Sequence, residues 1–138
     1  MQLQKRFRWS LLEFVQSAIE ENIPFLFAVD TSIDRCVGWC DVVQKAETVG
    51  YLGTGLLPDY RGQGLGKRLI QEVVALSKAY GYHQIELDVR SSNQRAIHVY
   101  GQLGFSVFHV VKDGYTFKGN AVAEDVVQMR LDLTGRSE

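Results

Sequence analysis

Three glycines stand at alternate positions in the run Leu56-Leu57-Pro58-Asp59-Tyr60-Arg61-Gly62-Gln63-Gly64-Leu65-Gly66-Lys67, between a strand-like segment and a helix-like one. A turn with so little side-chain bulk lets several backbone N–H groups point into one small volume. The helix that follows adds its own unpaired N–H groups and the positive end of its dipole. The run therefore predicts an anion-binding loop, best suited to a phosphate or a pyrophosphate.

The spacing of the glycines distinguishes between kinds of phosphate loop. A Walker loop would need glycine at Arg61 and a hydroxyl at Arg68, and a dinucleotide fingerprint fails in every register. The spacing Arg/Gln-x-x-Gly-x-Gly/Ala does fit, over Arg61 to Gly66. For six residues taken alone the alternative is an ordinary loop-to-helix turn, so the flanking sequence has to decide.

A second block carries polar side chains at fixed places: Ile85-Glu86-Leu87-Asp88-Val89-Arg90-Ser91-Ser92-Asn93, then Ala96-Ile97, Tyr100 and Leu103-Gly104-Phe105. In order and spacing, the two blocks resemble the acetyl-CoA loop, strand, Asn-capped helix and Leu-Gly-Phe ending of the GNAT superfamily of N-acetyltransferases. The segment 125–131 is similar to the family's final strand, so the resemblance covers about residues 25 to 133. It implies transfer of an acetyl group from acetyl-CoA to an amine acceptor.

The resemblance also implies a fold and a set of cofactor contacts. The fold would be an α+β GNAT fold, a central and mostly antiparallel mixed sheet, flanked by helices, that splays into a V between two parallel strands. Those strands would be Thr48–Leu57 and Gln84–Arg90, in a single domain over residues 1–138 whose acetyl-CoA-binding core lies at about 48–105. The pantetheine arm would lie on the first strand and the pyrophosphate on the loop. The expected cofactor-binding residues are Thr54, Gly55, Leu56, Arg61, Gly62, Gln63, Gly64, Leu65, Gly66, Lys67, Asn93 and Tyr100.

The implied reaction is attack of an amine on the thioester carbonyl, which needs a donor for the carbonyl oxygen and a proton for the departing thiolate. Tyr100 matches the family tyrosine beside the CoA sulfur, and a phenol with a pKa of about 10 is protonated at neutral pH. The alternative is a tyrosine that only packs between helix and sheet. Asn93 matches an asparagine that contacts CoA, with a plain helix N-cap as the alternative. A backbone N–H near Leu56 is the expected oxyanion donor.

Asp88 is the expected general base, because ribosomal-protein alanine acetyltransferases of the family have a glutamate at the matching place. Aspartate is one methylene shorter, so a water would have to bridge. Glu86, Glu47 and a plain surface acid are the alternatives, and none of the three histidines is assigned a catalytic role. Deprotonation at pH 7 costs roughly 4.6 kcal/mol for a lysine amine but only about 1.4 kcal/mol for an α-amine. A weak base therefore favours a low-pKa amine or a water-relayed mechanism.

The acceptor pocket of the family is built by its first helices and by the loop between its last two strands, here residues 111–125. The acids and aromatic residues of this loop would attract and hold an amine, unless it is an ordinary solvated hairpin: Asp113, Tyr115, Phe117, Glu124 and Asp125. Few residues precede Phe25, so we expect a pocket that is open to a peptide terminus or completed by a second subunit in a homodimer. The rival functions are a noncatalytic acyl-CoA-binding module and a transferase for a longer acyl-CoA.

Apolar periodicity predicts the elements that position these residues. Helices are expected over Trp9–Asn22, over Leu65–Tyr80 and from Asn93 to Gln102. Strands are expected at residues 2–8, 25–29, 36–43, 48–57, 84–90, 105–111 and 126–133. The fourth of these strands contains glycines at 50, 53 and 55, which predicts either a bulge or a ligand close against its backbone.

Composition limits the class of protein. The 138 residues suit one domain, and the net charge of −1 argues against a nucleic-acid-binding surface. No apolar run predicts a membrane span or a secretion signal, and no His/Cys cluster has metal-ligand spacing. Cys36 and Cys40 would share a strand face about 13 Å apart, too far for a disulfide. We expect reduced core thiols in a cytoplasmic protein.

Overall fold

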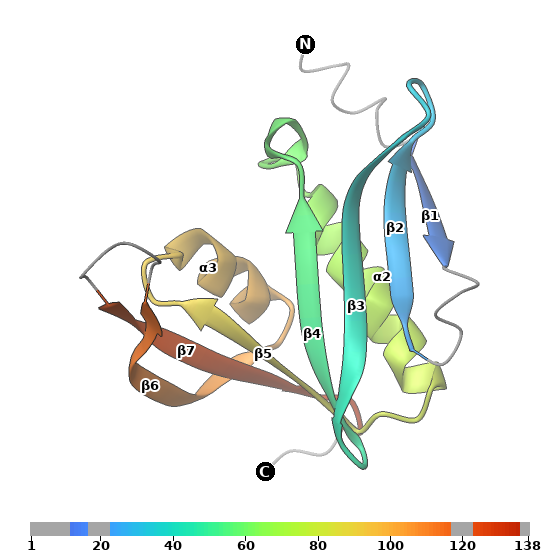
Figure 1. The fold of residues 1–138 in the computed structure, drawn as a ribbon. Coiled ribbons are helices and arrows are strands. Elements are labelled where there is room, and N and C mark those ends of the chain that lie inside the picture. The colour runs from blue at the N-terminus through green and yellow to red at the C-terminus, as the bar shows by residue number, and fades with distance from the viewer. Residues whose placement is uncertain (1–11, 17–22, 117–122, 136–138) are drawn as a thin grey trace.

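The computed structural model of the chain describes residues 12–16, 23–116 and 123–135. Over these residues the fold is a seven-stranded sheet in the order β1-β2-β3-β4-β5-β7-β6, parallel between β4 and β5 and antiparallel elsewhere (Figure 1). The elements are β1 (Leu12–Gln16), β2 (Phe25–Asp30), β3 (Arg35–Ala46), β4 (Val49–Leu56), the 3-10 turn η1 (Pro58–Tyr60), α2 (Leu65–Ala79), β5 (Gln84–Arg90), α3 (Gln94–Gln102), β6 (Ser106–Thr116) and β7 (Ala123–Asp132). The predicted α+β class and the parallel pair are confirmed.

The sheet splays where β4 and β5 part. These strands pair only from Val49–Gln84 to Tyr51–Glu86. Beyond that point β4 continues beside β3 and β5 continues beside β7, so the sheet opens into a V, as Figure 1 shows. The predicted splay is confirmed, and it leaves one edge of each of the two strands facing the gap.

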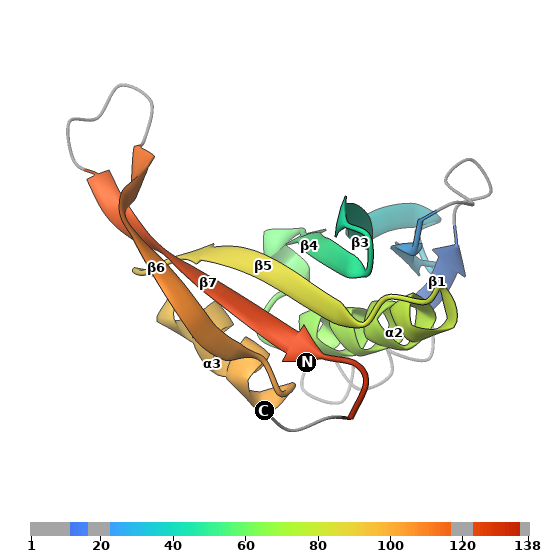
Figure 2. The ribbon, with the colours of Figure 1, turned by 90° about the horizontal axis from the view of Figure 1, so that it is seen from below.

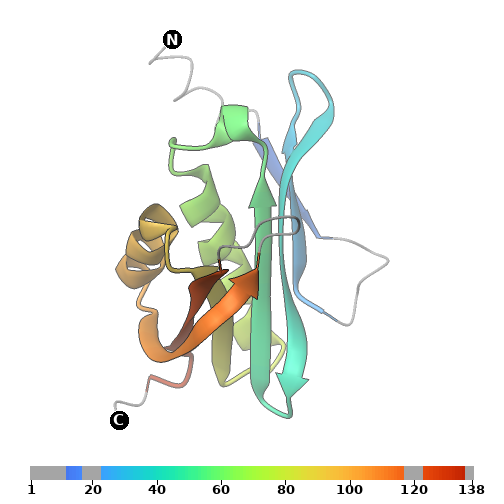
Figure 3. The same cartoon turned by 60° about the vertical axis from the view of Figure 1, so that its left-hand side comes forward.

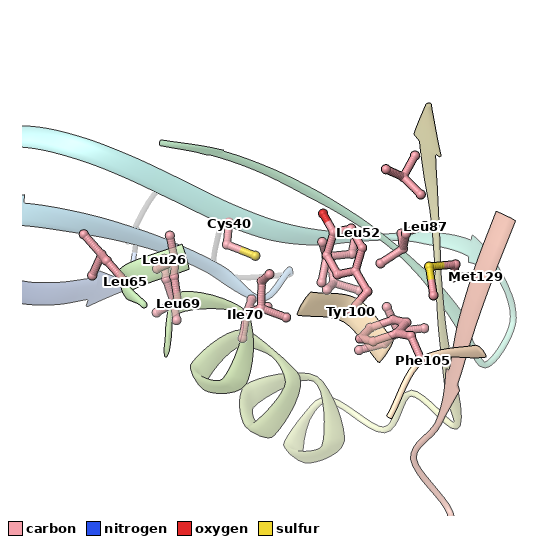
Figure 4. Packing of buried hydrophobic residues seen from close by; sticks show 14 of the residues in the cluster. Leu26, Cys40, Leu52, Leu65, Leu69, Ile70, Leu87, Tyr100, Phe105 and Met129 are labelled. Atoms are coloured by element: carbon pink, nitrogen blue, oxygen red, sulfur yellow. The ribbon is translucent and has the colours of Figure 1, made fainter. Parts of the chain in front are cut away.

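Both described helices lie on the same side of the sheet (Figures 2 and 3). The apolar stripe of α2 is buried against β2–β4 at Leu65, Leu69, Ile70 and Val73, and α3 lies beside the β5 arm (Figure 1). Gly81, with φ +94°, ends α2 in a backbone conformation that favours glycine. Figure 4 shows the core between the helices and the sheet. Its members are Leu26, Ala28, Val37, Cys40, Val42, Leu52, Tyr60, Leu65, Leu69, Ile70, Val73, Ile85, Leu87, Val89, Tyr100, Phe105, Val127 and Met129.

The predicted helix over Trp9–Asn22 is wrong in its described part. Residues 12–16 form β1, which pairs antiparallel with β2 from Leu12–Asp30 to Gln16–Leu26. A five-residue stretch containing Phe14 and Val15 suits a strand as well as a helix, so local periodicity was ambiguous. The edge of β2 favours the strand, because its N–H and C=O groups offer hydrogen bonds to residues 12–16 that a helix could not make. The strand predicted at residues 2–8 lies outside the described residues.

The prediction that Cys36 and Cys40 share a face is also wrong. A bulge separates the pairs Ala28–Gly38 and Val29–Cys36, so Val37 is the extra residue in β3. The bulge shifts the alternation of side chains, which leaves Cys36 exposed and Cys40 buried, both as free thiols. Only one of the two predicted core cysteines therefore lies in the core.

The connection expected at residues 111–125 is shorter than predicted. β6 continues to Thr116 and β7 begins at Ala123, because the two strands pair again after a register shift between Val111 and Tyr115. Asp113, Tyr115, Glu124 and Asp125 thus belong to strands, and Phe117 lies outside the described residues. Most of the predicted acceptor loop is therefore a two-stranded β-ribbon.

Candidate active site

The segment at residues 61–66, which we call the glycine loop, follows η1 and connects the end of β4 to the start of α2. Gly62 and Gly64 have φ angles of +74° and +83°, which disfavour any other residue. Gly64 is the N-cap of α2 and has no side chain to occupy the first N–H groups of the helix. The loop therefore presents unpaired donors and the positive end of a helix dipole together, as an anion site requires.

The side chains of the loop hold it in place. Arg61 Nε donates to the Leu56 carbonyl at 2.9 Å, and Gln63 Nε2 donates to the Asp59 carbonyl at 3.0 Å. The Leu65 side chain is buried in the core at 2% exposure. Arg61 thus orients the loop against the end of β4, while the Leu65 side chain, buried in the core, leaves only its backbone to a ligand.

A cavity of about 490 Å³ opens between this loop, β4 and α3, and we call it the donor cavity. It brings together ten of the twelve predicted cofactor residues: Thr54, Gly55, Leu56, Arg61, Gly62, Gly64, Gly66, Lys67, Asn93 and Tyr100. Gln63 and Leu65 do not line it. Residues not predicted to bind the cofactor complete the lining: Ile70, Arg95, Ala96, Val99 and Gln102. Helical spacing from Asn93 and Tyr100 was the signal that could have found Ala96 on the same face of α3.

Arg95 is the most consequential of these additions. It lies in the first turn of α3, and a Cβ atom built on Gly62 would be 2.8 Å from Arg95 Nη2. The guanidinium group therefore crosses the glycine loop in space that only glycine leaves free. Lys67, whose Nζ is 3.5 Å from Gln102 Oε1, adds a second cation at the same cavity. These charges and the start of α2 together favour an anion.

Asn93 is both a helix cap and a cavity residue. Its Oδ1 accepts the Ala96 N–H at 3.2 Å, which caps α3 as the sequence predicts. The same residue lines the donor cavity and a second cavity described below. The two predicted roles are thus geometrically compatible.

Tyr100 lies between α3 and the sheet with 9% of its surface exposed (Figure 4). Its ring packs edge-on against Phe105, with 5.8 Å between the ring centroids. Burial raises the pKa of the Tyr100 phenol to about 12, and the neighbouring Cys40 adds to the rise. Tyr100 therefore holds its proton throughout the physiological range and can act as a hydrogen-bond or proton donor.

A second cavity, of about 420 Å³, meets the donor cavity at α3, and we call it the acceptor cavity. The two share Asn93, Ala96 and Tyr100 among their lining residues. The acceptor cavity is completed by residues of β5, β6 and β7: Asp88, Val89, Arg90, Gly114, Tyr115 and Val126. Tyr100 thus stands where the two spaces join, and the predicted catalytic pair Tyr100 and Asp88 lines one cavity.

Asp88 lies on β5 among hydrogen-bond donors. Gln128 Nε2 donates to Asp88 Oδ1 at 3.1 Å, and the Tyr51 hydroxyl also hydrogen-bonds the carboxylate. Burial raises the pKa of Tyr51 to about 12, and the charge of Asp88 contributes to this rise. Glu86, the alternative base, forms an ion pair with Lys45 and lines neither cavity. The geometry thus favours Asp88 over Glu86.

Two acids of the predicted acceptor loop, Glu124 and Asp125, accept hydrogen bonds from backbone N–H groups. Glu124 Oε1 accepts the Ser92 N–H at 2.9 Å, and this bond is the main reason that the Glu124 pKa is lowered. Asp125 Oδ1 accepts the Asp113 N–H at 3.0 Å. Of the residues predicted to hold the acceptor, only Tyr115 lines the acceptor cavity within the described parts of the chain.

The glycines of β4 have close side-chain neighbours that the sequence did not predict. Trp39 lies across the face of β4 away from the helices, and a Cβ on Gly55 would be 2.5 Å from its Nε1. A Cβ on Gly53 would be 3.3 Å from the same indole, and one on Gly50 would be 2.3 Å from Val42 Cγ1. Neighbouring side chains thus lie close to all three glycines, and Gly55 also lines the donor cavity.

Neither cavity contains a histidine among its lining residues. Across residues 12–16, 23–116 and 123–135 there is no group of three His, Cys, Asp or Glu side chains that could hold a metal ion. In the same residues, none of the helices has the length and apolar character needed to cross a membrane.

Comparison with known proteins places these features in context. The family model described as Acetyltransferase (GNAT) family matches residues 2–105. The ribosomal protein bS18-alanine N-acetyltransferase of Escherichia coli K12 is 35% identical over 56% of this chain and 51% of its own length. The L-amino acid N-acyltransferase of the same organism is 31% identical over 59% of this chain and 46% of its own length. The chain thus spans about half the length of either relative, and a third or less of some others.

A solved structure shows the same fold. A protein from Salmonella typhimurium, described as an acetyltransferase and solved with its cofactor acetyl-CoA, superposes with a TM-score of 0.73 over 84% of this chain and 68% of its own. The two sequences are 19% identical, so the likeness concerns the fold.

Proposed function

This chain belongs to the acetyltransferase (GNAT) family, and we propose that it transfers the acetyl group of acetyl-CoA to the nitrogen of a primary amine in a ternary complex. The observation that carries this proposal is the meeting of two cavities at Tyr100. One cavity has the donors and cations for a pyrophosphate, and the other holds a carboxylate. Placing both reactants at one proton donor supplies the proximity on which such a transfer depends.

Acetyl-CoA binding follows from the donor cavity. The diphosphate would be held by the N–H groups of the glycine loop together with Arg95 and Lys67. The pantetheine arm would run along the β4 edge that faces the V, where Thr54, Gly55 and Leu56 line the cavity. Within the described part of the chain this edge has no partner strand beyond Tyr51, so its backbone groups are available to an extended ligand.

The carbonyl oxygen of the thioester would be stabilised by the Leu56 N–H. The next N–H along the chain, that of Leu57, donates to the Val37 carbonyl at 2.9 Å, toward β3. Successive N–H groups of a strand point in opposite directions, so the Leu56 N–H points toward the gap of the V. A donor fixed in this way lowers the energy of the oxyanion without reorganising.

Proton transfers would involve Asp88 and Tyr100. The Asp88 carboxylate accepts a proton from the ammonium group through a water, which leaves a neutral amine to attack the carbonyl carbon. As the C–N bond forms and the C–S bond breaks, Tyr100 donates its proton to the thiolate of CoA. The nitrogen then loses its second proton through water to the Tyr100 phenolate, which becomes a phenol again, and Asp88 releases its proton to solvent. The products are an amide, the free thiol and one proton.

The two relatives differ in acceptor by their names, since one is an N-acetyltransferase for an alanine of ribosomal protein bS18 and the other an N-acyltransferase for L-amino acids. Both are α-amines, which supports an α-amine acceptor for this chain. We also place the protein in the cytoplasm, which the free thiols of Cys36 and Cys40 support. A homodimer remains a prediction.

The test is isothermal titration with acetyl-CoA, CoA and ATP, followed by thiol-release assays with amino acids, peptides and polyamines. We expect acetyl-CoA and CoA to bind, ATP not to bind, and at least one amine to be acetylated. Binding without turnover of any acceptor would favour a noncatalytic acyl-CoA-binding module. A higher kcat/KM with longer acyl chains would favour a different acyl donor. Absence of acetyl-CoA binding would contradict the proposal.

A further inference from the structure

We propose that the amine acceptor also carries a carboxylate, as an amino acid does, and that Arg90 binds this carboxylate while Asp88 faces the ammonium group. The inference rests on the proposed N-acetyltransferase function, because it concerns the acceptor of that reaction. It is carried by the acceptor cavity, whose lining includes one carboxylate and one guanidinium group.

The two charges are placed by β5. Asp88 and Arg90 are two residues apart, so their side chains leave the same face of the strand, with Cα atoms about 6.6 Å apart. Their neighbours in the cavity are apolar, aromatic or amide groups. A cavity with one charge of each sign is complementary to a small zwitterion. A polyamine would instead bring a second cation toward Arg90.

The exposed Arg90 side chain is oriented by an aromatic neighbour. Its Cζ lies 5.0 Å from the centroid of the Tyr115 ring, in cation–π contact. A guanidinium group that stacks by its face keeps N–H groups at its edge for a planar carboxylate. Glu124 is close enough to Arg90 to feel its charge, but it accepts the Ser92 N–H and does not line the cavity. The guanidinium group of Arg90 is therefore the cation that a ligand in this cavity contacts, through the N–H groups at its edge.

The position of the pair relative to Tyr100 sets the direction of binding. Asp88, Arg90 and Tyr100 line one cavity, and Tyr100 is shared with the donor cavity. With its amine at Asp88 and Tyr100, the acceptor would have its carboxylate at Arg90, away from the thioester. The short Cα separation suits a carboxylate within a few bonds of the amine, as in an α-amino acid.

The experiment is a double comparison of acceptors and variants, using thiol release from acetyl-CoA. The acceptors are matched pairs of an L-amino acid and its amide, with spermidine as an acceptor that has no anionic group. The variants are the wild type, Arg90→Gln, Arg90→Lys and the control Arg130→Gln. Arg130 also stacks on an aromatic ring, with Cζ 4.6 Å from the Phe108 centroid, and lines neither cavity. The amide has a different amine pKa, but this difference cancels when one pair is compared between two variants.

We expect Arg90→Gln to lower kcat/KM for the amino acid about tenfold or more and for the amide less than threefold. Arg90→Lys should recover part of the loss and Arg130→Gln should leave both values unchanged. Equal losses for acid and amide, or spermidine as the better wild-type acceptor, would overturn the carboxylate assignment. Circular dichroism and titration with CoA check that Arg90→Gln is folded and keeps its donor cavity. Wild-type protein that binds acetyl-CoA but acetylates none of the acceptors would overturn the proposed function and this inference with it.

Discussion

Tyr100 is the single residue on which the chemistry of this site most depends. It joins the two cavities and keeps its proton because its pKa is raised to about 12. We expect Tyr100→Phe to lower kcat by about 10² to 10⁴ while the affinity for CoA changes little, because a general acid contributes in that range. Steady-state kinetics and CoA titration on the same protein check this. Unchanged kcat would leave Tyr100 a packing residue.

The same raised pKa sets the pH dependence of the reaction. Below the pKa of the acceptor amine, kcat/KM should rise with pH, because more of the amine is neutral. Tyr100 stays protonated until the pH approaches about 12, so no descending limb from its ionisation is expected up to pH 10. A pH–rate profile from 6 to 10 checks the rise and the absence of a fall, and a fall in rate above pH 9 with intact protein would argue against Tyr100 as the acid.

Arg95 makes a prediction about the cofactor alone. Because it crosses the glycine loop, its charge should act on the diphosphate and not on the acetyl group. Arg95→Gln should lower kcat/KM for acetyl-CoA about tenfold, in line with loss of one charge-assisted hydrogen bond, and leave S-acetylpantetheine unaffected. Arg68→Gln is the matched control. Arg68 is an exposed arginine on α2, the helix that follows the glycine loop, and it does not line the donor cavity. Equal losses with both donors would contradict the assignment.

At the scale of elements, β4 lies between the donor cavity and the side chain of Trp39. Gly55 lines the donor cavity, and the indole of Trp39 lies against the same residue. Gly55→Ala would place a methyl group 2.5 Å from Trp39 Nε1, so the indole or the strand must shift. We expect a loss of about 1–3 kcal/mol in the free energy of unfolding, the usual range for overpacking. Urea denaturation measures it, and Trp39→Ala in the same chain should recover much of the loss. Independent, additive effects of the two substitutions would show that the contact does not matter.

At the scale of the whole molecule, the buried core should make the fold sensitive to alkaline pH. Burial raises the pKa of Cys40 from 9.0 to about 12 and that of Tyr100 from 10.0 to about 12. At a pH between the ordinary pKa of each group and its raised pKa, the folded chain holds a proton that the unfolded chain releases. The free energy of unfolding therefore falls as pH rises through this range. Well below pH 9 these groups are protonated in both states and add no pH dependence. Urea unfolding from pH 8 to 11 should therefore show a decline that is shallower in Tyr100→Phe, and equal slopes in both proteins would contradict this.

Local sequence determined the parts of this protein in which each residue's role depends on its near neighbours. The glycine loop, the stripe of α2, β5 and the Asn93 cap all follow from backbone conformation or from a helical or strand period, and the structure confirms each. Ten of the predicted cofactor residues gather in one cavity because they lie at the ends of such elements.

Only the tertiary structure decided what depends on contacts between distant segments. The edge of β2 makes residues 12–16 a strand, the bulge at Val37 separates the two cysteines, and Trp39 fills the space beside the β4 glycines. Arg90 and Arg95 gain their importance from Tyr115 and Gly62, which are at least 25 residues away in the sequence. A one-dimensional pattern states which side chains are available, but packing in three dimensions decides which of them share a cavity.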